Sequence, residues 1–139
     1  MSFMDAIKIC FSKYVDFDGR ARRSEFWWFY LAIFIGSLIP FFGLVIYLAT
    51  IIPFYAAGAR RLHDTDRSGW WQAAPYVPAL IGVGLLSSAF GDDGSLIDND
   101  LVIAGGGLCV LAVVAYIVII VWLASDTHPG PNRFGTAPK

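Results

Sequence analysis

The chain has 139 residues, 57% of them hydrophobic and only 15% charged, with a mean hydropathy of +0.61. This balance excludes an ordinary soluble domain. The ten Lys and Arg residues are spread over three short segments, 8–23, 60–67 and 133–139, so they form no single basic face of the kind that binds nucleic acid.

Long uncharged stretches separate the three basic segments. They cover residues 26–59, 69–91 and 101–125, and the remaining polar segment, 92–100, holds only acidic charges. Hydrocarbon is a poor solvent for charge, and Lys and Arg stay on the cytoplasmic side of a membrane. The pattern therefore predicts a multi-pass protein of the bacterial inner membrane with basic cytoplasmic ends and an acidic external loop.

The N-terminal residues 1–22 are expected on the cytoplasmic side. Within them, apolar side chains recur at steps of three or four, which predicts a short amphipathic helix lying on the membrane surface. They are Phe3, Ile7, Cys10, Phe11 and Tyr14. The alternative is a disordered basic leader.

The first uncharged stretch, 26–59, is too long for one crossing, because it would make a helix of about 50 Å where about 30 Å suffices. Pro40 and Gly43 predict a tight turn within it. We therefore expect two transmembrane helices, 23–39 and 44–61. The alternative, one long tilted helix, would place the basic segment 60–67 outside the cell.

A third helix is expected at 70–90, where Pro75 and Pro78 should kink or delay its start, and a fourth at 101–124. Residues 125–139 then form a cytoplasmic tail. The sequence thus predicts an all-α fold, a single membrane domain of four transmembrane helices preceded by a short interfacial amphipathic helix, with both termini cytoplasmic. Glycines should allow close helix packing, namely Gly36, Gly82, Gly84 and Gly105 to Gly107.

Paired tryptophans stand where two of these helices leave the cytoplasm. Trp27 and Trp28 follow Arg22 and Arg23, and a second pair, Trp70 and Trp71, follows Arg67. Tryptophan favours the membrane interface, so all four are expected to be interfacial anchors. The two stretches resemble each other because both need arginine and tryptophan as anchors, so convergence explains the likeness. The alternative is duplication of a two-helix unit.

Three motifs resemble those of a known family. They are Phe17-x-Gly-Arg-x-x-Arg-x-Glu-Phe-Trp-Trp28, the block Arg60-Arg61-Leu62-His63-Asp64, and Asn132-Arg133-Phe134-Gly135. Together they resemble the bacterial inner-membrane family called domain of unknown function 805, over nearly the whole chain. The resemblance implies a small multi-span membrane protein without an established biochemical activity. The chain departs from the family in its short first hairpin and its acidic loop.

The densest polar cluster offers two interpretations. Its arginines would bind a phosphate or carboxylate, such as a lipid headgroup, or they would only anchor helix ends on the cytoplasmic side. Helical spacing suggests the pairs Arg60–Asp64 and Arg61–Thr65. Glu25 needs a cationic partner, and the choice lies among Arg22, Arg60 and Arg61. The cluster comprises Arg60, Arg61, His63, Asp64, Arg67, Glu25, Arg22 and Arg23.

The tail motif is expected to dock on this cluster through Asn132, Arg133, Phe134 and Gly135, with a flexible solvated tail as the alternative. His63 and Asp64 are too few to predict a metal site, even with His128 in the tail. Cys10 lies near the N-terminus and Cys109 inside an apolar run, so neither a disulfide nor a metal pair between them is expected.

No nucleophile–base set, metal-ligand set or phosphate loop is evident, so neither a catalytic centre nor a cofactor is expected. The first hypothesis is a non-enzymatic scaffold or accessory subunit that contacts another membrane protein or a second copy of itself. The second is a module that binds anionic lipids or other anions through residues 60–67. A transporter component is the least favoured, because no ionisable group lies deep in any predicted span.

Overall fold

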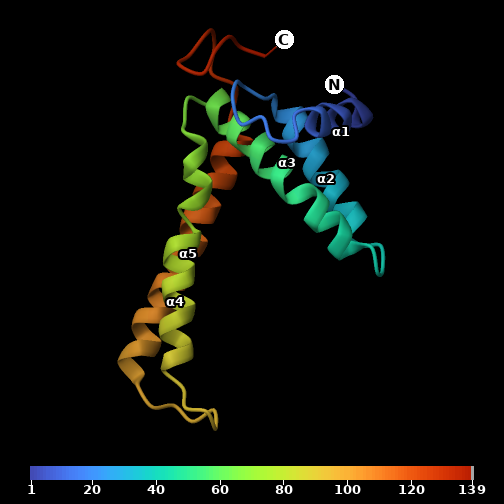
Figure 1. Cartoon of the computed structure of the whole chain (residues 1–139). Coiled ribbons are helices and arrows are strands. Elements are labelled where there is room, and N and C mark those ends of the chain that lie inside the picture. The colour runs from blue at the N-terminus through green and yellow to red at the C-terminus, as the bar shows by residue number, and fades with distance from the viewer. Residues whose placement is uncertain (139) are drawn as a thin grey trace. The chain divides into compact units, whose positions relative to one another are not determined.

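The computed structural model describes residues 1–138, which form helices and loops with two isolated β-bridges and no strand among them. The predicted all-α class is confirmed. The chain divides into two compact units: Met1–Gly69 with Trp122–Lys139, called here the first unit, and Trp70–Val121, the second unit. The elements in chain order are α1 (Phe3–Ser12), α2 (Arg23–Ser37), α3 (Gly43–Asp64), the 3-10 helix η1 (Gly69–Ala73), α4 (Tyr76–Ser88) and α5 (Asn99–Ala124) (Figure 1).

Two helices within the described residues are long and apolar enough to cross a membrane. They are α3, with 22 residues, and α5, with 26 residues. At 1.5 Å per residue they measure about 33 and 39 Å, against a hydrocarbon core of about 30 Å. Helices α2 and α4 have 15 and 13 residues and measure about 22 and 20 Å, which is short of that thickness.

Helix α1 is an ordered helix and not a disordered leader. Ser2 and Asp5 form a reciprocal capping box at its start, each side chain accepting the other's backbone N–H at 3.2 Å. Its buried face carries Ala6 and Cys10, and Phe3 meets Trp28 of α2 edge to face, with ring centroids 5.9 Å apart. Helix α1 is therefore packed on α2 through the same apolar stripe that predicted it.

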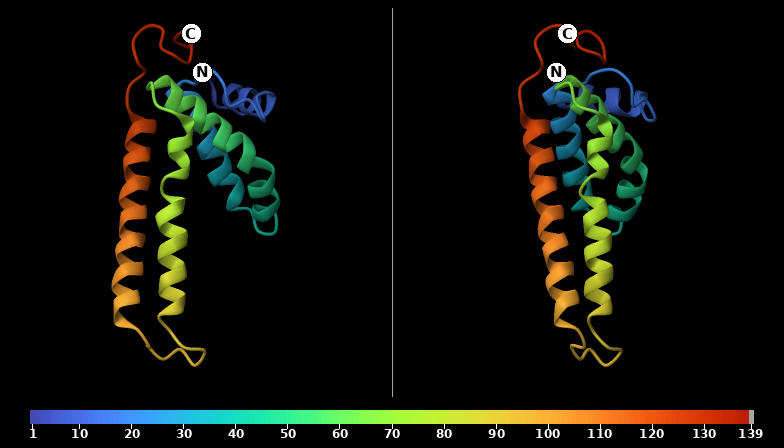
Figure 2. Two further views of the ribbon diagram at one scale, coloured as in Figure 1. Left: turned by 60° about the vertical axis from the view of Figure 1, so that its left-hand side comes forward. Right: turned by 90° about the vertical axis from the view of Figure 1, so that its left-hand side faces the viewer.

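Helices α2 and α3 form an antiparallel hairpin within the first unit (Figure 2). Phe26 of α2 stacks near Phe54 of α3 with ring centroids 5.6 Å apart. A Cβ added at Gly36 would lie 3.1 Å from the Ile46 side chain, so this glycine permits the close approach expected of it.

A tyrosine distant in sequence replaces the hydrogen bond that a proline removes from α3. Pro53 lacks a backbone N–H, so the carbonyl of Ala49, four residues earlier, receives no helical hydrogen bond. The Tyr14 hydroxyl donates to that carbonyl at 2.8 Å. The loop after α1 thus satisfies the acceptor that the proline leaves open, which fixes this loop against α3.

Helix α3 ends in a Schellman motif. Arg67 N–H donates to the Leu62 carbonyl at 2.9 Å and Asp66 N–H donates to the His63 carbonyl at 3.0 Å. Asp66 takes the left-handed conformation, with φ of 60°, where many helices place glycine. This motif turns the chain sharply after Asp64 and holds the end of α3 in a defined shape.

The expected helix 70–90 is interrupted in the structure. It begins as η1, and α4 starts only at Tyr76, with Pro75 as its N-cap. Pro75 and Pro78 donate no backbone hydrogen bond, so they fit the first turn of a helix and not its interior. Of the two effects expected of the prolines, a kink or a delay, the structure shows the delay, and α4 spans Tyr76–Ser88 instead of 70–90.

Helices α4 and α5 of the second unit pack through two glycines. A Cβ at Gly82 would lie 2.8 Å from the Gly105 carbonyl oxygen, and a Cβ at Gly105 would lie 2.7 Å from the Gly82 carbonyl oxygen. The other three glycines expected at close contacts, Gly84, Gly106 and Gly107, have nothing within 4 Å of such an atom. The prediction holds for one glycine on each helix and is wrong for these three.

Candidate functional site: a buried arginine–carboxylate network

The last two turns of α3 carry the most buried charges of the first unit. Arg60, Arg61 and Asp64 are all 0% exposed. Burying a charge is costly unless it is paired and hydrogen-bonded, so the partners of these side chains decide what the block can do.

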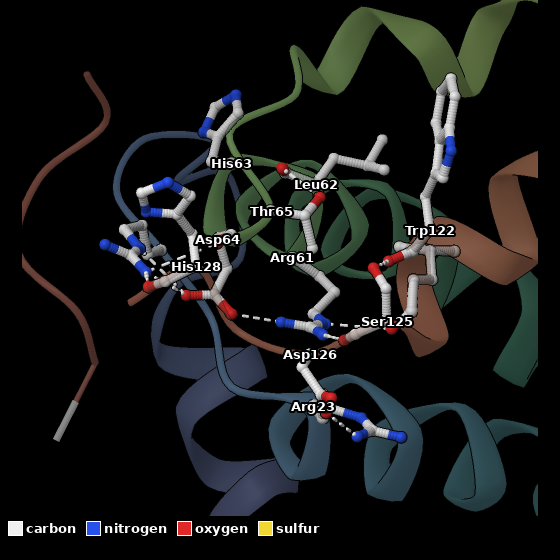
Figure 3. Close-up of polar contacts among 12 residues, drawn as sticks. Arg23, Arg61, Leu62, His63, Asp64, Thr65, Trp122, Ser125, Asp126 and His128 are labelled. Carbon is white, nitrogen blue, oxygen red and sulfur yellow. Dashed lines mark hydrogen bonds and ion pairs between the residues drawn. The ribbon is translucent and has the colours of Figure 1, made fainter. Parts of the chain in front are cut away.

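Asp64 stands between two guanidinium groups. The Arg20 Nε and Nη2 atoms each lie 2.9 Å from its Oδ1, and Arg61 donates to its Oδ2 (Figure 3). The Arg20 side chain is as fully enclosed as that of Asp64. One carboxylate thus joins the loop before α2 to the end of α3.

Arg61 also caps the end of α5. Its Nε donates to the Leu123 carbonyl at 3.0 Å, and its Nη2 donates to the Ser125 carbonyl (Figure 3). The last carbonyls of a helix have no partner within the helix and carry partial negative charge. Arg61 therefore compensates the end of α5 while it pairs with Asp64.

Arg60 faces the other side of α3. Its Nη2 lies 3.0 Å from Glu25 Oε1, and its Nη1 donates to the Asp16 carbonyl. Of the three partners considered for Glu25, the structure selects Arg60. The pairs suggested by helical spacing, Arg60–Asp64 and Arg61–Thr65, are wrong, because Arg61 pairs with Asp64 and the Thr65 hydroxyl donates to the Leu62 carbonyl.

Arg20 was missed as a site residue, although it lies inside the first motif. Besides Asp64, it donates to the backbone carbonyls of Gly130 at 2.7 Å and His128 at 2.8 Å. A glycine–arginine pair in a loop has no periodicity that marks it as buried. Its role appears only when the tail and the end of α3 are brought together.

The tail lies against this network. The Asn132 amide donates to the His63 carbonyl at 2.8 Å, and Arg133 Nε lies 3.3 Å from an Asp66 carboxylate oxygen. Phe134 stacks on the His63 ring at 3.9 Å between centroids, and the Asn132 and Gly135 backbones form a two-hydrogen-bond turn. Phe134 therefore covers the His63 ring.

The remaining cluster residues lie outside the buried network. Arg23 pairs with Asp126 at 2.7 Å on the surface, and the Arg67 guanidinium lies 4.7 Å from the Trp122 ring centre. The Arg22 side chain makes no hydrogen bond or ion pair within the described part of the chain. The structure thus buries two ion-paired groups, Glu25 with Arg60 and Asp64 with Arg61 and Arg20. Arg22, Arg23 and Arg67 lie at the edge of these groups.

The tryptophans expected as anchors differ in packing. Trp27 lies against Phe26 and Tyr30, whereas Trp28 is partly exposed beside α1. In the second unit, Trp70 and Trp71 both expose much of their surface. Their interfacial position stays a prediction.

His63 and His128 do not converge on a metal-binding geometry. His63 Nδ1 lies 3.1 Å from the Gly19 carbonyl, and the His128 residue is exposed. Within residues 1–138, no three His, Cys, Asp or Glu side chains lie close enough to hold a metal ion.

Cys10 lies beside the network and is 0% exposed. Burial raises the pKa of its thiol from 9.0 to about 12, the Glu25 carboxylate adds to the rise, and Arg60 opposes it. The thiol is therefore protonated throughout the physiological range. Its contribution to stability is complete below about pH 9 and is lost as the pH rises toward 12.

In a Cys109→Ala variant, we expect Cys10 to react with a maleimide at pH 8 at least about 100-fold more slowly than an exposed thiol, because the thiolate is the reactive form. The comparison is a thiol placed at exposed Thr136 in a chain without Cys10 and Cys109, timed by mass spectrometry. Unfolding in detergent should remove the difference. Equal rates in the folded protein would contradict the buried position of Cys10.

The chain is similar in sequence to a family of membrane proteins. The profile of a family described as Protein of unknown function (DUF805) matches residues 35–136, well over half of the chain. The inner membrane protein YhaI of Escherichia coli strain K12 is 29% identical over 138 residues, covering 91% of this chain and 88% of that protein. The inner membrane protein YhaH of the same strain is 28% identical over 146 residues, covering 91% and 89%. No solved structure matches significantly.

Proposed function

Because the chain belongs to the DUF805 family of proteins of unknown function, we propose that it is a non-catalytic scaffold or accessory subunit of a membrane protein assembly. The family expected from the three motifs is confirmed. The similarity to two inner membrane proteins and the two long apolar helices make it an inner-membrane protein. Two features support the scaffold role, an apolar surface on α5 and the internal pairing of the buried arginines.

The observation that carries the proposal is an apolar seam on α5, which turns away from α4. It repeats in alternating steps of four and three residues, the spacing by which one helix packs on another. Its five branched side chains are between 51% and 73% exposed, and Gly107 in the same row has open space around it. The seam comprises Ile103, Gly107, Val110, Val114, Ile117 and Val121.

The buried network favours an architectural role for the arginine motif. Arg60 and Arg61 are fully buried, and their guanidinium groups pair with carboxylates and carbonyls of the chain itself. A phosphate or lipid headgroup would have to displace those partners. We therefore do not propose residues 60–67 as a ligand site, and the motif serves to tie α1, α2, α3 and the tail together.

The scaffold proposal is tested on two adjacent glycines of α5. Gly106 and Gly107 both have nothing within 4 Å of an added Cβ, but only Gly107 belongs to the seam. Gly107→Leu should weaken association with the partner or second copy about tenfold, which corresponds to about 1.4 kcal/mol. Gly106→Leu is the matched control and should leave association unchanged.

The measurement is quantitative cross-linking in native membranes, followed by purification in mild detergent and mass spectrometry of the cross-linked species. Equal association in both variants and in the unaltered protein would overturn the seam as a contact surface. Finding only monomer in native membranes would overturn the scaffold proposal as a whole.

We further propose four crossings, with both termini and residues 65–68 in the cytoplasm and the loop 92–100 outside. The confinement of every Lys and Arg to one side supports it. Helices α2 and α4 would cross with help from flanking residues and local thinning of the bilayer.

This topology predicts the labelling of single thiols in a chain without Cys10 and Cys109. An impermeant maleimide added to intact spheroplasts should label Ser95→Cys, and should label Asp66→Cys and Thr136→Cys only after lysis. These three positions are exposed. Labelling of Asp66→Cys in intact spheroplasts would exclude four crossings.

A further inference from the structure

The first unit contains an open groove that lies apart from the buried network. It is bounded by the end of α1, by residues 19–25 and by the tail, and its volume is about 890 Å³. This size is within the range of small-molecule sites, roughly 300–1,000 Å³. Its apolar wall includes Ile9, Phe134 and Pro138, and its polar wall includes Lys13, Arg20, Arg22 and Glu25.

Some charged residues of this groove are paired with an opposite charge, and others are not. Arg20 pairs with Asp64, and Glu25 pairs with Arg60, so neither offers a free charge. The Arg22 side chain makes no hydrogen bond or ion pair within the described residues. Lys13 is 45% exposed and approaches Asp16 only to 4.0 Å. The accessible charge of the groove is therefore positive.

A second feature adjoins the groove. Arg60 is fully buried behind two of the lining residues, since it bonds the Glu25 carboxylate and the Lys13 carbonyl. Its Nε atom is the one buried side-chain nitrogen or oxygen without a hydrogen-bond partner in the part of the chain that the structure describes. Unsatisfied buried donors are rare in folded proteins. Beside this groove, the Arg60 Nε–H is such a donor, because no described residue offers it an acceptor.

We propose that this groove binds a phosphate-bearing anion, with Arg22 and Lys13 as the residues that contact it. A guanidinium group matches the geometry of phosphate oxygens, and an ammonium group adds a compact second charge. Ile9 and Phe134 provide apolar surface for the rest of the ligand. The phosphate belongs either to a phospholipid headgroup or to a free phosphate compound, and the site is distinct from the proposed scaffold seam.

The test uses the full chain in a neutral detergent, with phosphatidylglycerol and inorganic phosphate as the two probes. Native mass spectrometry counts bound lipid, and competition by phosphate measures the free anion. The double variant Arg22→Gln, Lys13→Gln should bind the probe at least about tenfold more weakly. Lys8→Gln with Arg23→Gln is the charge-matched control, because neither residue is among those that line the groove and Arg23 makes only a surface ion pair. This control should bind normally.

Lipid binding that millimolar phosphate does not reverse identifies a headgroup, and binding of phosphate alone identifies a free anion. Both outcomes support the groove. Equal loss in the control and groove variants would show unspecific attraction and overturn it, as would binding of neither probe. Arg22→Lys keeps the charge and should retain most of the binding, which separates loss of the site from loss of the fold.

Discussion

Asp64→Ala is expected to destabilise the protein by about 3–5 kcal/mol, because it leaves two buried guanidinium groups without their carboxylate. Asp64 is the carboxylate partner of both Arg20 and Arg61. Both arginine side chains are buried, so water cannot take the place of the lost carboxylate. The measurement is the midpoint of thermal unfolding in mild detergent, followed by size-exclusion chromatography.

Asp126→Ala provides the control for that experiment. Asp126 also pairs with an arginine, Arg23, but its side chain is 95% exposed, and surface pairs of this kind contribute little. Its unfolding midpoint should stay close to that of the unaltered protein. Similar midpoints for Asp64→Ala and Asp126→Ala would contradict the buried network as the tie between α3 and the tail.

The second large effect is expected at the glycine contact between α4 and α5. Gly82→Leu places a Cβ 2.8 Å from the Gly105 carbonyl oxygen, where the obstacle is backbone and cannot turn aside. Overpacking of a well-packed contact costs about 1–3 kcal/mol, and a leucine that separates the two helices costs more. Thermal unfolding in detergent should show this as a lower midpoint.

Gly84→Leu is the matched control on the same helix, since nothing lies within 4 Å of a Cβ at Gly84. It should unfold near the midpoint of the unaltered protein. If Gly84→Leu destabilises as much as Gly82→Leu, the loss comes from the helix surface and not from the contact between α4 and α5.

The all-α class and the family could be predicted from the sequence, because both depend on patterns of neighbouring residues. The spacing of Phe3 and Cys10 indicated α1, and the uncharged stretches indicated α2 to α5. The start of α4 was harder. Pro75 and Pro78 predicted an irregular start of this helix, but the sequence does not show whether a proline kinks a helix or delays its start.

The sequence by itself determined that this is an all-α membrane protein of a recognisable family, since hydropathy and motifs are properties of neighbouring residues. Tertiary structure alone decided that Glu25 pairs with Arg60, that Arg20 joins Asp64 to the tail, and that Gly82 and Gly105 form the close contact. These partners lie far apart along the chain. A buried charge requires a partner but does not specify one, and only the folded chain brings one candidate within hydrogen-bonding distance.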